Sequence, residues 1–273
     1  MDARDEESSA TKSTSQPLAV ETLADEALDL VGTRFPQAVG ALLGGSAAQG
    51  RATASSDLDV AVLLPDGDTG RRELLRHHGR LAELFVHTVS DVPAAFERDR
   101  FQRRGTILFL YENGLPLLDP YGHVVRARER ARQILAAGPP ALTPAEWERG
   151  RYLLTCFMDD LADAPPTARY EQLALADGVL REAVHLLTAH LNAWTGIGRW
   201  LPRRLLNADP VRGRALLAGH RTVAEHADPA PLATAAAQVL SLCGGPLREG
   251  YRQTWGPGPG DAAPPPLSRR SPR

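Results

Sequence analysis

Lysine and cysteine are almost absent from this chain of 273 residues. Lys12 is the only lysine, so arginine carries nearly all of the positive charge. The rest of the chain therefore has no Walker A lysine, kinase strand lysine or Schiff-base lysine, which excludes P-loop enzymes and kinase-like phosphotransferases. The two cysteines are Cys156 and Cys243, and neither stands in a CxxC motif or a Cys/His cluster that could hold zinc.

Long apolar runs and an excess of one charge are lacking as well. No stretch reaches about 18 uninterrupted apolar residues, and the polar N-terminus lacks the apolar core of a signal peptide. Together with the scarcity of cysteine, this predicts a cytoplasmic protein without a membrane partner. The 31 basic and 33 acidic residues give a net charge of -2, so no long nucleic acid is expected as a partner.

The composition changes along the chain and predicts two domains between two disordered ends. Residues 1–16 are rich in Ser, Thr and charge, and residues 256–273 are rich in Pro and Gly, so neither end is expected to fold. Residues 17–138 mix short apolar runs with turn signals, as an α/β or α+β domain does. Residues 139–255 follow a helical period, which predicts a helical bundle.

Local patterns in the first domain predict one helix and several strands. The helix is expected near residues 18–31, and strands at 38–43, 58–64 and 81–88. The apolar run 106–111, followed by Asn113-Gly114 and a second apolar run, indicates a hairpin or a strand-turn-strand unit.

In the second domain, helix signals are clearer. Thr143-Pro144-Ala145-Glu146 is a capping box with Pro at the first helical position, so a helix should begin there. A second long helix should span residues 170–194 and end at Thr195-Gly196. Shorter helices should follow through residues 205–206, 216–217 and 232–242.

Two aspartates stand at the start of an apolar strand within residues 42–64, LLGGSAAQGRATASSDLDVAVLL. Asp57 and Asp59 are two residues apart, so in a strand both side chains project to the same face. Two carboxylates at that distance repel each other, and Mg²⁺ is the natural compensator because it binds carboxylates together with substrate phosphates. Taken alone, Asp-Leu-Asp also fits a solvated strand edge or a helix N-cap.

The same segment contains a Gly-Gly-Ser turn after an apolar strand. At Gly44 and Gly45 the backbone has no Cβ, so it can approach a polyphosphate closely and turn its N–H groups toward it. Ser46 adds a hydroxyl donor. Taken alone, this sequence also fits an ordinary turn.

The combination of both features is more specific than either. A strand, Gly-Gly-Ser, a polar spacer and Ser-Asp-x-Asp entering an apolar strand resemble the DNA polymerase β-type nucleotidyltransferase superfamily, over about residues 40–90. The resemblance implies that Gly45 and Ser46 bind a nucleoside triphosphate. It also implies that Asp57, Asp59 and an acid on a neighbouring strand bind two Mg²⁺ ions and carry catalysis. Glu83, the only acid in the apolar run 81–88, is mapped to that third position.

A fused helical domain narrows the resemblance to the antibiotic nucleotidyltransferases of the kanamycin and streptomycin type. This implies an α+β fold in which a nucleotidyltransferase domain, with a small mixed sheet flanked by helices, precedes a C-terminal helical bundle that binds the acceptor. In such enzymes the bundle can supply a base, and the candidates here are Asp159, Asp160 and Asp177, each of which also fits a surface acid. The link 196–202 could line the acceptor site, or Trp200 could serve packing.

His87 and the segment 97–104 each allow two interpretations. His87 has the same strand parity as Glu83 and could point into the cleft, although a structural histidine is the simpler interpretation. The segment 97–104, ERDRFQRR, has four arginines that could clamp phosphates or form a solvated helix face.

Three functions compete on these grounds. The first is transfer of an NMP, with AMP the first choice, to a hydroxyl of a small molecule such as an aminoglycoside. The second is NMP transfer to a tyrosine of a partner protein, as in antitoxin-type nucleotidyltransferases, in which the helical domain is often a separate chain. The third is a catalytically silent nucleotide-binding protein. The fused bundle favours the first, and the presence of all three acids argues against the third.

Overall fold

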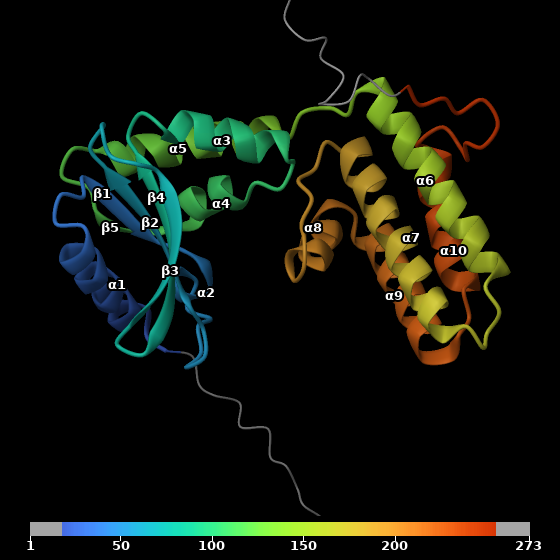
Figure 1. Ribbon diagram of the computed structural model, residues 1–273, viewed down its shortest axis with the longest axis horizontal. Helices are drawn as coiled ribbons and strands as arrows, with labels where there is room; N and C mark the ends of the chain where they lie inside the picture. Colours follow the sequence, from blue (N-terminus) through green and yellow to red (C-terminus); the bar gives the residue numbers. More distant parts are fainter. Residues whose placement is uncertain (1–17, 255–273) are drawn as a thin grey trace, which may run out of the picture. The chain divides into compact units, whose positions relative to one another are not determined.

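The computed structural model describes residues 18–254, and the expectations for both chain ends, including Lys12, lie outside this range. The described chain forms two compact units. The first runs to Ala141 and takes in Leu191–Asp209, and the second consists of Leu142–His190 and the chain from Pro210 onward. Figure 1 shows the elements of each unit.

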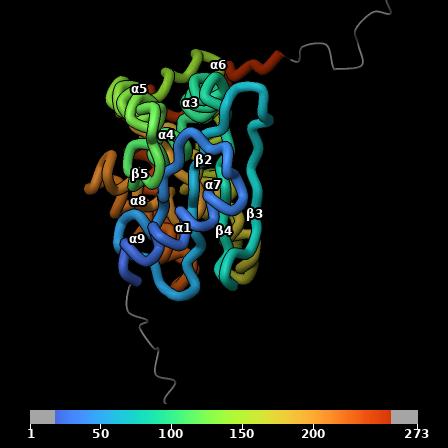
Figure 2. The backbone as a smooth tube through the Cα atoms, turned by 90° about the vertical axis from the view of Figure 1, so that its left-hand side faces the viewer, coloured from blue at the N-terminus to red at the C-terminus, as the bar shows by residue number. Residues whose placement is uncertain are grey.

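A five-stranded sheet is the centre of the first unit. Its strands are β1 (Gly40–Leu43), β2 (Leu58–Leu64), β3 (Arg71–His77), β4 (Arg80–Thr88) and β5 (Leu115–Leu118). They lie side by side in the order β3-β4-β2-β1-β5, and Figure 2 shows β3, β4 and β2 next to one another. Because β2 and β4 run parallel while the other neighbours run antiparallel, the sheet is mixed, as predicted.

Helices cover both faces of this sheet. Successive side chains of β2 point to opposite faces, and each set packs against helices. Leu58, Val60 and Val62 pack in one core with α1 (Val20–Arg34). The intervening Ala61 and Leu63 pack in a second core with the other helices of the unit. These helices are α3 (Val92–Phe101), α4 (Thr106–Asn113) and α5 (His123–Ala137) (Figure 1). Asp59 shares the parity of Ala61, so it lies on the α3–α5 face.

The second unit is a bundle of helices, as predicted. It contains α6 (Pro144–Asp163), α7 (Arg169–His190), α9 (Pro210–His226) and α10 (Ala230–Leu242). The predicted capping box is confirmed, because the Thr143 hydroxyl accepts from the N–H of Glu146 and the Glu146 carboxylate accepts from the N–H of Thr143 at 2.8 Å. Among residues 18–254, no helix combines the length and the apolar character needed to cross a membrane.

The segment with helix α8 (Trp200–Ala208) groups with the first unit, although its position in the sequence suggested the helical domain. α7 ends at His190, so the prediction that this helix reaches Trp194 was wrong. The Trp194 indole instead donates to the carbonyl of Leu135 at 3.1 Å and packs in the core of the first unit. Such a long-range partner leaves no trace in helical periodicity.

Helix α4 replaces a strand that the sequence predicted at residues 106–111. Its apolar run is as compatible with a buried helix as with a strand, and a carboxylate from the preceding helix decides between them. Asp99, only 7% exposed, accepts from the N–H groups of Thr106, Ile107 and Leu108 at 2.7–3.0 Å. The sequence also gave no sign of β3, because an edge strand reading RRELLRH lacks an apolar run.

Replacing Asp99 with Ala is expected to lower the free energy of unfolding by roughly 2–3 kcal/mol, because three backbone donors lose their acceptor inside the protein. Asp66→Ala is the matched control, since Asp66 is exposed and accepts one N–H, from Ser90 at 2.9 Å. The control should lose about 1 kcal/mol or less. Urea unfolding measures both, and equal losses would show that Asp99 does not determine the helix.

Candidate active site

The sheet brings the three predicted acids together. Asp57 directly precedes β2, Asp59 lies within it, and Glu83 stands opposite Asp59 in the parallel register of β2 and β4. Carboxylate oxygens of all three lie within 4.8 Å of one another. Each side chain is partly buried, so water screens their mutual repulsion only in part.

The pKa of Asp59 reflects this crowding. Burial first, then the negative charges of Asp57 and Glu83, raise the pKa of Asp59 to about 6, while Arg199 and Arg72 act in the opposite direction. Arg72 Nε also donates a hydrogen bond to Glu83. The two guanidinium groups compensate the cluster incompletely, which leaves an electrostatic environment suited to additional positive charge.

The Gly-Gly-Ser turn lies against the same carboxylates. The N–H of Gly44 donates to the backbone carbonyl of Asp59 at 2.7 Å, which ties the end of β1 to β2. Gly45 adopts a φ of +59°, and a Cβ at this position would overlap the Asp59 Oδ2 atom. Ser46 follows in α2 (Gly45–Ala48) and lines the same pocket as the acids. Glycine is therefore required here both by conformation and by space.

A pocket of about 540 Å³ joins these groups, and its lining lies entirely within the first unit. The turn, the three acids, residues of α4 and the segment around α8 line it. Five arginines are also among its lining residues: Arg72, Arg104, Arg199, Arg203 and Arg204. The volume suits a ligand of nucleotide size, and the arginines suit its phosphates.

The arginines of segment 97–104 were expected either to clamp phosphates or to form a solvated helix face, and the structure places them differently from one another. Arg104 lines the pocket. Arg103 is buried and donates to the carbonyl of Pro140, and Arg100 forms a surface ion pair with Glu97 at 3.2 Å. One arginine of the four is thus placed to meet a phosphate.

Helix α8 contributes cations that sequence reasoning missed. The Arg204 guanidinium lies 3.3 Å from the centre of the Phe109 ring and 5.2 Å from that of Trp200. Burial lowers the pKa of Arg204 to about 10, so the group remains charged at neutral pH. Trp200 is 40% exposed and lines the pocket, together with Gly196, Ile197 and Arg199 of the same link. The only sequence signal was a tryptophan flanked by arginines.

His87 and two of the proposed helical bases have other partners. His87 Nδ1 lies 3.3 Å from the Tyr111 hydroxyl, and burial lowers the pKa of His87, as expected of a structural histidine. In the second unit, Asp159 forms an ion pair with Arg248 at 2.6 Å. Asp177 likewise lies 2.9 Å from His220 Nε2.

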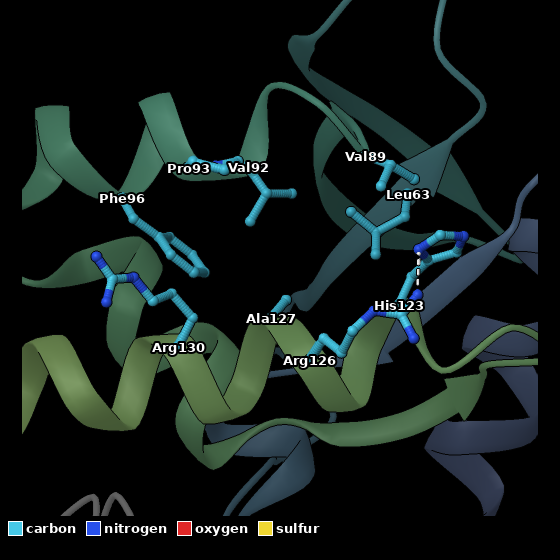
Figure 3. Close-up of a pocket in the computed structure, with 9 residues that line it drawn as sticks. All are labelled: Leu63, Val89, Val92, Pro93, Phe96, His123, Arg126, Ala127 and Arg130. Carbon is cyan, nitrogen blue, oxygen red and sulfur yellow. Dashed lines mark hydrogen bonds between the residues drawn. The ribbon is translucent and has the colours of Figure 1, made fainter.

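A second hollow, of about 210 Å³, lies between α3 and α5 (Figure 3). Apolar side chains such as Leu63 and Phe96 line it, together with His123, Arg126 and Arg130. His123 Nδ1 and Arg126 are 2.9 Å apart. In the part of the chain that the structure describes, no carboxylate lines this hollow, so it lacks the ligands of a magnesium site.

A comparison with known protein families agrees with the motif. Residues 24–111, which contain the turn and the three acids, match the family described as "Nucleotidyltransferase domain". This stretch is a nucleotidyltransferase domain of the polymerase β type. The protein is therefore a nucleotidyltransferase.

Two other comparisons add less. No curated protein matches the chain. Among solved structures, a nucleotidyltransferase-like protein from Exiguobacterium sibiricum 255-15 is similar, with 9% identity and a TM-score of 0.43. That match covers 81% of this chain and 74% of the other.

Proposed function

We propose that this nucleotidyltransferase transfers an NMP, with AMP the first choice, from a nucleoside triphosphate to a hydroxyl group of a small molecule and releases pyrophosphate. The observation that carries the proposal is the convergence of Asp57, Asp59 and Glu83 beside the Gly45-Ser46 turn in one pocket. Neither feature is specific alone, but three clustered carboxylates next to a turn that leaves room for a phosphate suit metal-assisted phosphoryl chemistry.

The carboxylate cluster fits Mg²⁺. Its ligands are hard oxygens, and the missing Cβ of Gly45 keeps the space beside Asp59 open. Burial and the negative charges of Asp57 and Glu83 raise the pKa of Asp59, and a bound cation would favour its charged form. Asp57, Asp59 and Glu83 would hold two ions. When bound, these ions would offset the triphosphate charge and lower the pKa of the attacking hydroxyl.

The chain's own groups bind and orient the substrates. The backbone at Gly45 and the Ser46 hydroxyl donate to the triphosphate, and the arginines of the α8 segment offset its charge. The acceptor oxygen forms a bond to the α-phosphorus as the bond from that phosphorus to the bridging oxygen breaks. Pyrophosphate leaves with the electron pair, and the hydroxyl proton passes to a base. No covalent enzyme intermediate is required.

The resemblance to antibiotic nucleotidyltransferases suggests an aminoglycoside-like acceptor, and the fused helical unit favours a small molecule over a partner protein. Both the transfer and its acceptor class can be tested with labelled nucleotides. ATP, GTP, CTP and UTP, each labelled with ³²P at the α or the γ position, are incubated with Mg²⁺ and pooled hydroxyl compounds, aminoglycosides included. The α label should appear on an acceptor and the γ label in pyrophosphate. Transfer of the γ label to an acceptor would contradict the proposal.

Ser46→Ala is expected to raise the KM for the nucleotide by roughly tenfold to a hundredfold, the range given by one hydrogen bond to a charged group. The matched control is Ser55→Ala, because Ser55 lies in the loop before β2 and bonds only the Thr53 hydroxyl, at 3.2 Å, among the residues described. Initial rates against nucleotide concentration measure the effect. An unchanged KM in the Ser46 variant would remove this hydroxyl from the phosphate site.

A further inference from the structure

We propose that the acceptor carries an anionic group, a phosphate or a carboxylate, next to its reactive hydroxyl, and that Arg72 binds this group. The inference rests on the proposed function and names the acceptor class for the same site. It departs from the aminoglycoside expectation, because aminoglycosides are polycations.

The sheet order determines the side from which the acceptor enters. In phosphoryl transfer the attacking and leaving oxygens lie roughly in line. The triphosphate is assigned to the Gly45-Ser46 turn, which follows β1, and β1 lies on one side of β2. The acceptor must then enter from the other side, over Glu83 on β4 and the neighbouring β3.

Arg72 is placed on that side and held in a defined orientation. It lies opposite Phe85 in the register of β3 and β4, and its guanidinium carbon is 5.3 Å from the Phe85 ring centre. Its Nε donates to Glu83, while its side chain remains 64% exposed. Within residues 18–254, neither Nη group of Arg72 has a protein hydrogen bond. The two Nη groups of its guanidinium can therefore bind a carboxylate or a phosphate.

The surface around Arg72 suits an anion and opposes a polycation. Side chains of β3 alternate, so Arg72, Leu74 and Arg76 share the face of Glu83, and Leu74 is 61% exposed. The acid of this strand, Glu73, lies on the opposite face, where Arg71 bonds it. The entry side thus offers guanidinium groups and apolar surface. A polyamine acceptor would meet like charges there, which costs affinity.

The charge of the whole pocket points the same way. Its lining contains five arginines and four acids, and three of the acids form the proposed metal site. Glu112 is the one carboxylate of the lining that remains for an acceptor amine. Arg104 and the arginines of the α8 segment are assigned to the triphosphate, so Arg72 is the arginine of the lining that remains for an anionic group of the acceptor.

The test measures anion binding with the triphosphate site filled. Wild-type protein saturated with Mg²⁺ and a non-hydrolysable nucleoside triphosphate is titrated with inorganic phosphate, and the melting temperature reports the affinity. Arg72→Gln should weaken phosphate binding by roughly tenfold or more, as expected for a charge-assisted bidentate contact. Arg76→Gln is the control, because Arg76 shares the strand and the face but bonds the Gly79 carbonyl. Equal phosphate affinity in wild type and Arg72→Gln would overturn the inference.

Turnover supplies the second readout and separates the two proposals. Acceptors identified by α-label transfer should be anionic, and Arg72→Gln should raise the acceptor KM more than it lowers kcat. Efficient transfer to kanamycin would contradict the inference while supporting the proposed function. An equal loss of kcat for every acceptor would show that Arg72 only positions Glu83. Transfer of the γ label instead of the α label would contradict the proposed function itself.

Discussion

Asp57→Asn and Asp59→Asn are each expected to lower NMP transfer by about a thousandfold or more without unfolding the protein. Asparagine keeps the shape of aspartate but removes the charge that would hold Mg²⁺. The metal supplies several kcal/mol of transition-state stabilisation, and each 1.36 kcal/mol corresponds to about tenfold in rate. Without metal, stability should be unchanged or slightly higher, because one of three mutually repelling carboxylates is gone.

Activity and stability should therefore change independently. Transfer of α label and the melting temperature in a chelating buffer are measured on the same preparations. Asp25→Asn is the control, because Asp25 is an exposed acid of α1, outside the pocket lining. Either aspartate variant with nearly full transfer would show that its carboxylate does not bind the metal. A variant that unfolds would show that the cluster is a structural element.

Gly45→Ala is expected to abolish nucleotide binding and turnover, whereas Gly50→Ala should leave both within about twofold. The two glycines have nearly the same backbone conformation, with φ of +59° and +63°, so alanine adds similar strain of about 1 kcal/mol at both. Their surroundings differ. A Cβ at Gly45 would overlap Asp59 Oδ2, whereas a Cβ at Gly50 has Val20 Cγ2 as its nearest neighbour, at 3.5 Å.

Comparing Gly45→Ala with Gly50→Ala separates the effect of backbone strain from the effect of filling the space beside Asp59. Melting temperature, titration with a Mg²⁺–nucleotide complex and α-label transfer are compared for both variants. A selective loss of nucleotide binding in Gly45→Ala, with both variants still folded, supports the account. Full nucleotide binding by Gly45→Ala would show that the phosphates do not use this turn.

The core of the candidate site could be predicted because its signals are local. Asp57 and Asp59 are two residues apart, and this spacing alone predicts that their side chains lie on the same face of a strand. Glu83 could be found because it is the only acid in an apolar strand, and the observed register places it opposite Asp59. The helical second unit also follows from a local signal, the capping box at Thr143.

Other parts depend on side-chain contacts that the local sequence pattern does not reveal. Helix α4 is selected over a strand by Asp99, and the α8 segment is tied to the first unit by the bond from Trp194 to Leu135. Arg204 consequently joins the pocket from a region of the chain that reads as an ordinary helix. Arg72 lies on an edge strand without an apolar run, so neither the strand nor its place beside Glu83 could be anticipated.

The central claim is that Asp57, Asp59 and Glu83 bind a metal–nucleotide complex, and stabilisation by ligand tests it without knowledge of the acceptor. The melting temperatures of wild type and Asp57→Asn are measured with and without Mg²⁺ and each nucleoside triphosphate. A ligand at a hundred times its Kd stabilises a protein by about 2.7 kcal/mol, so the wild-type melting temperature should rise by several degrees. The Asp57→Asn protein should gain little or nothing under the same conditions. Equal stabilisation of the two proteins would contradict the claim.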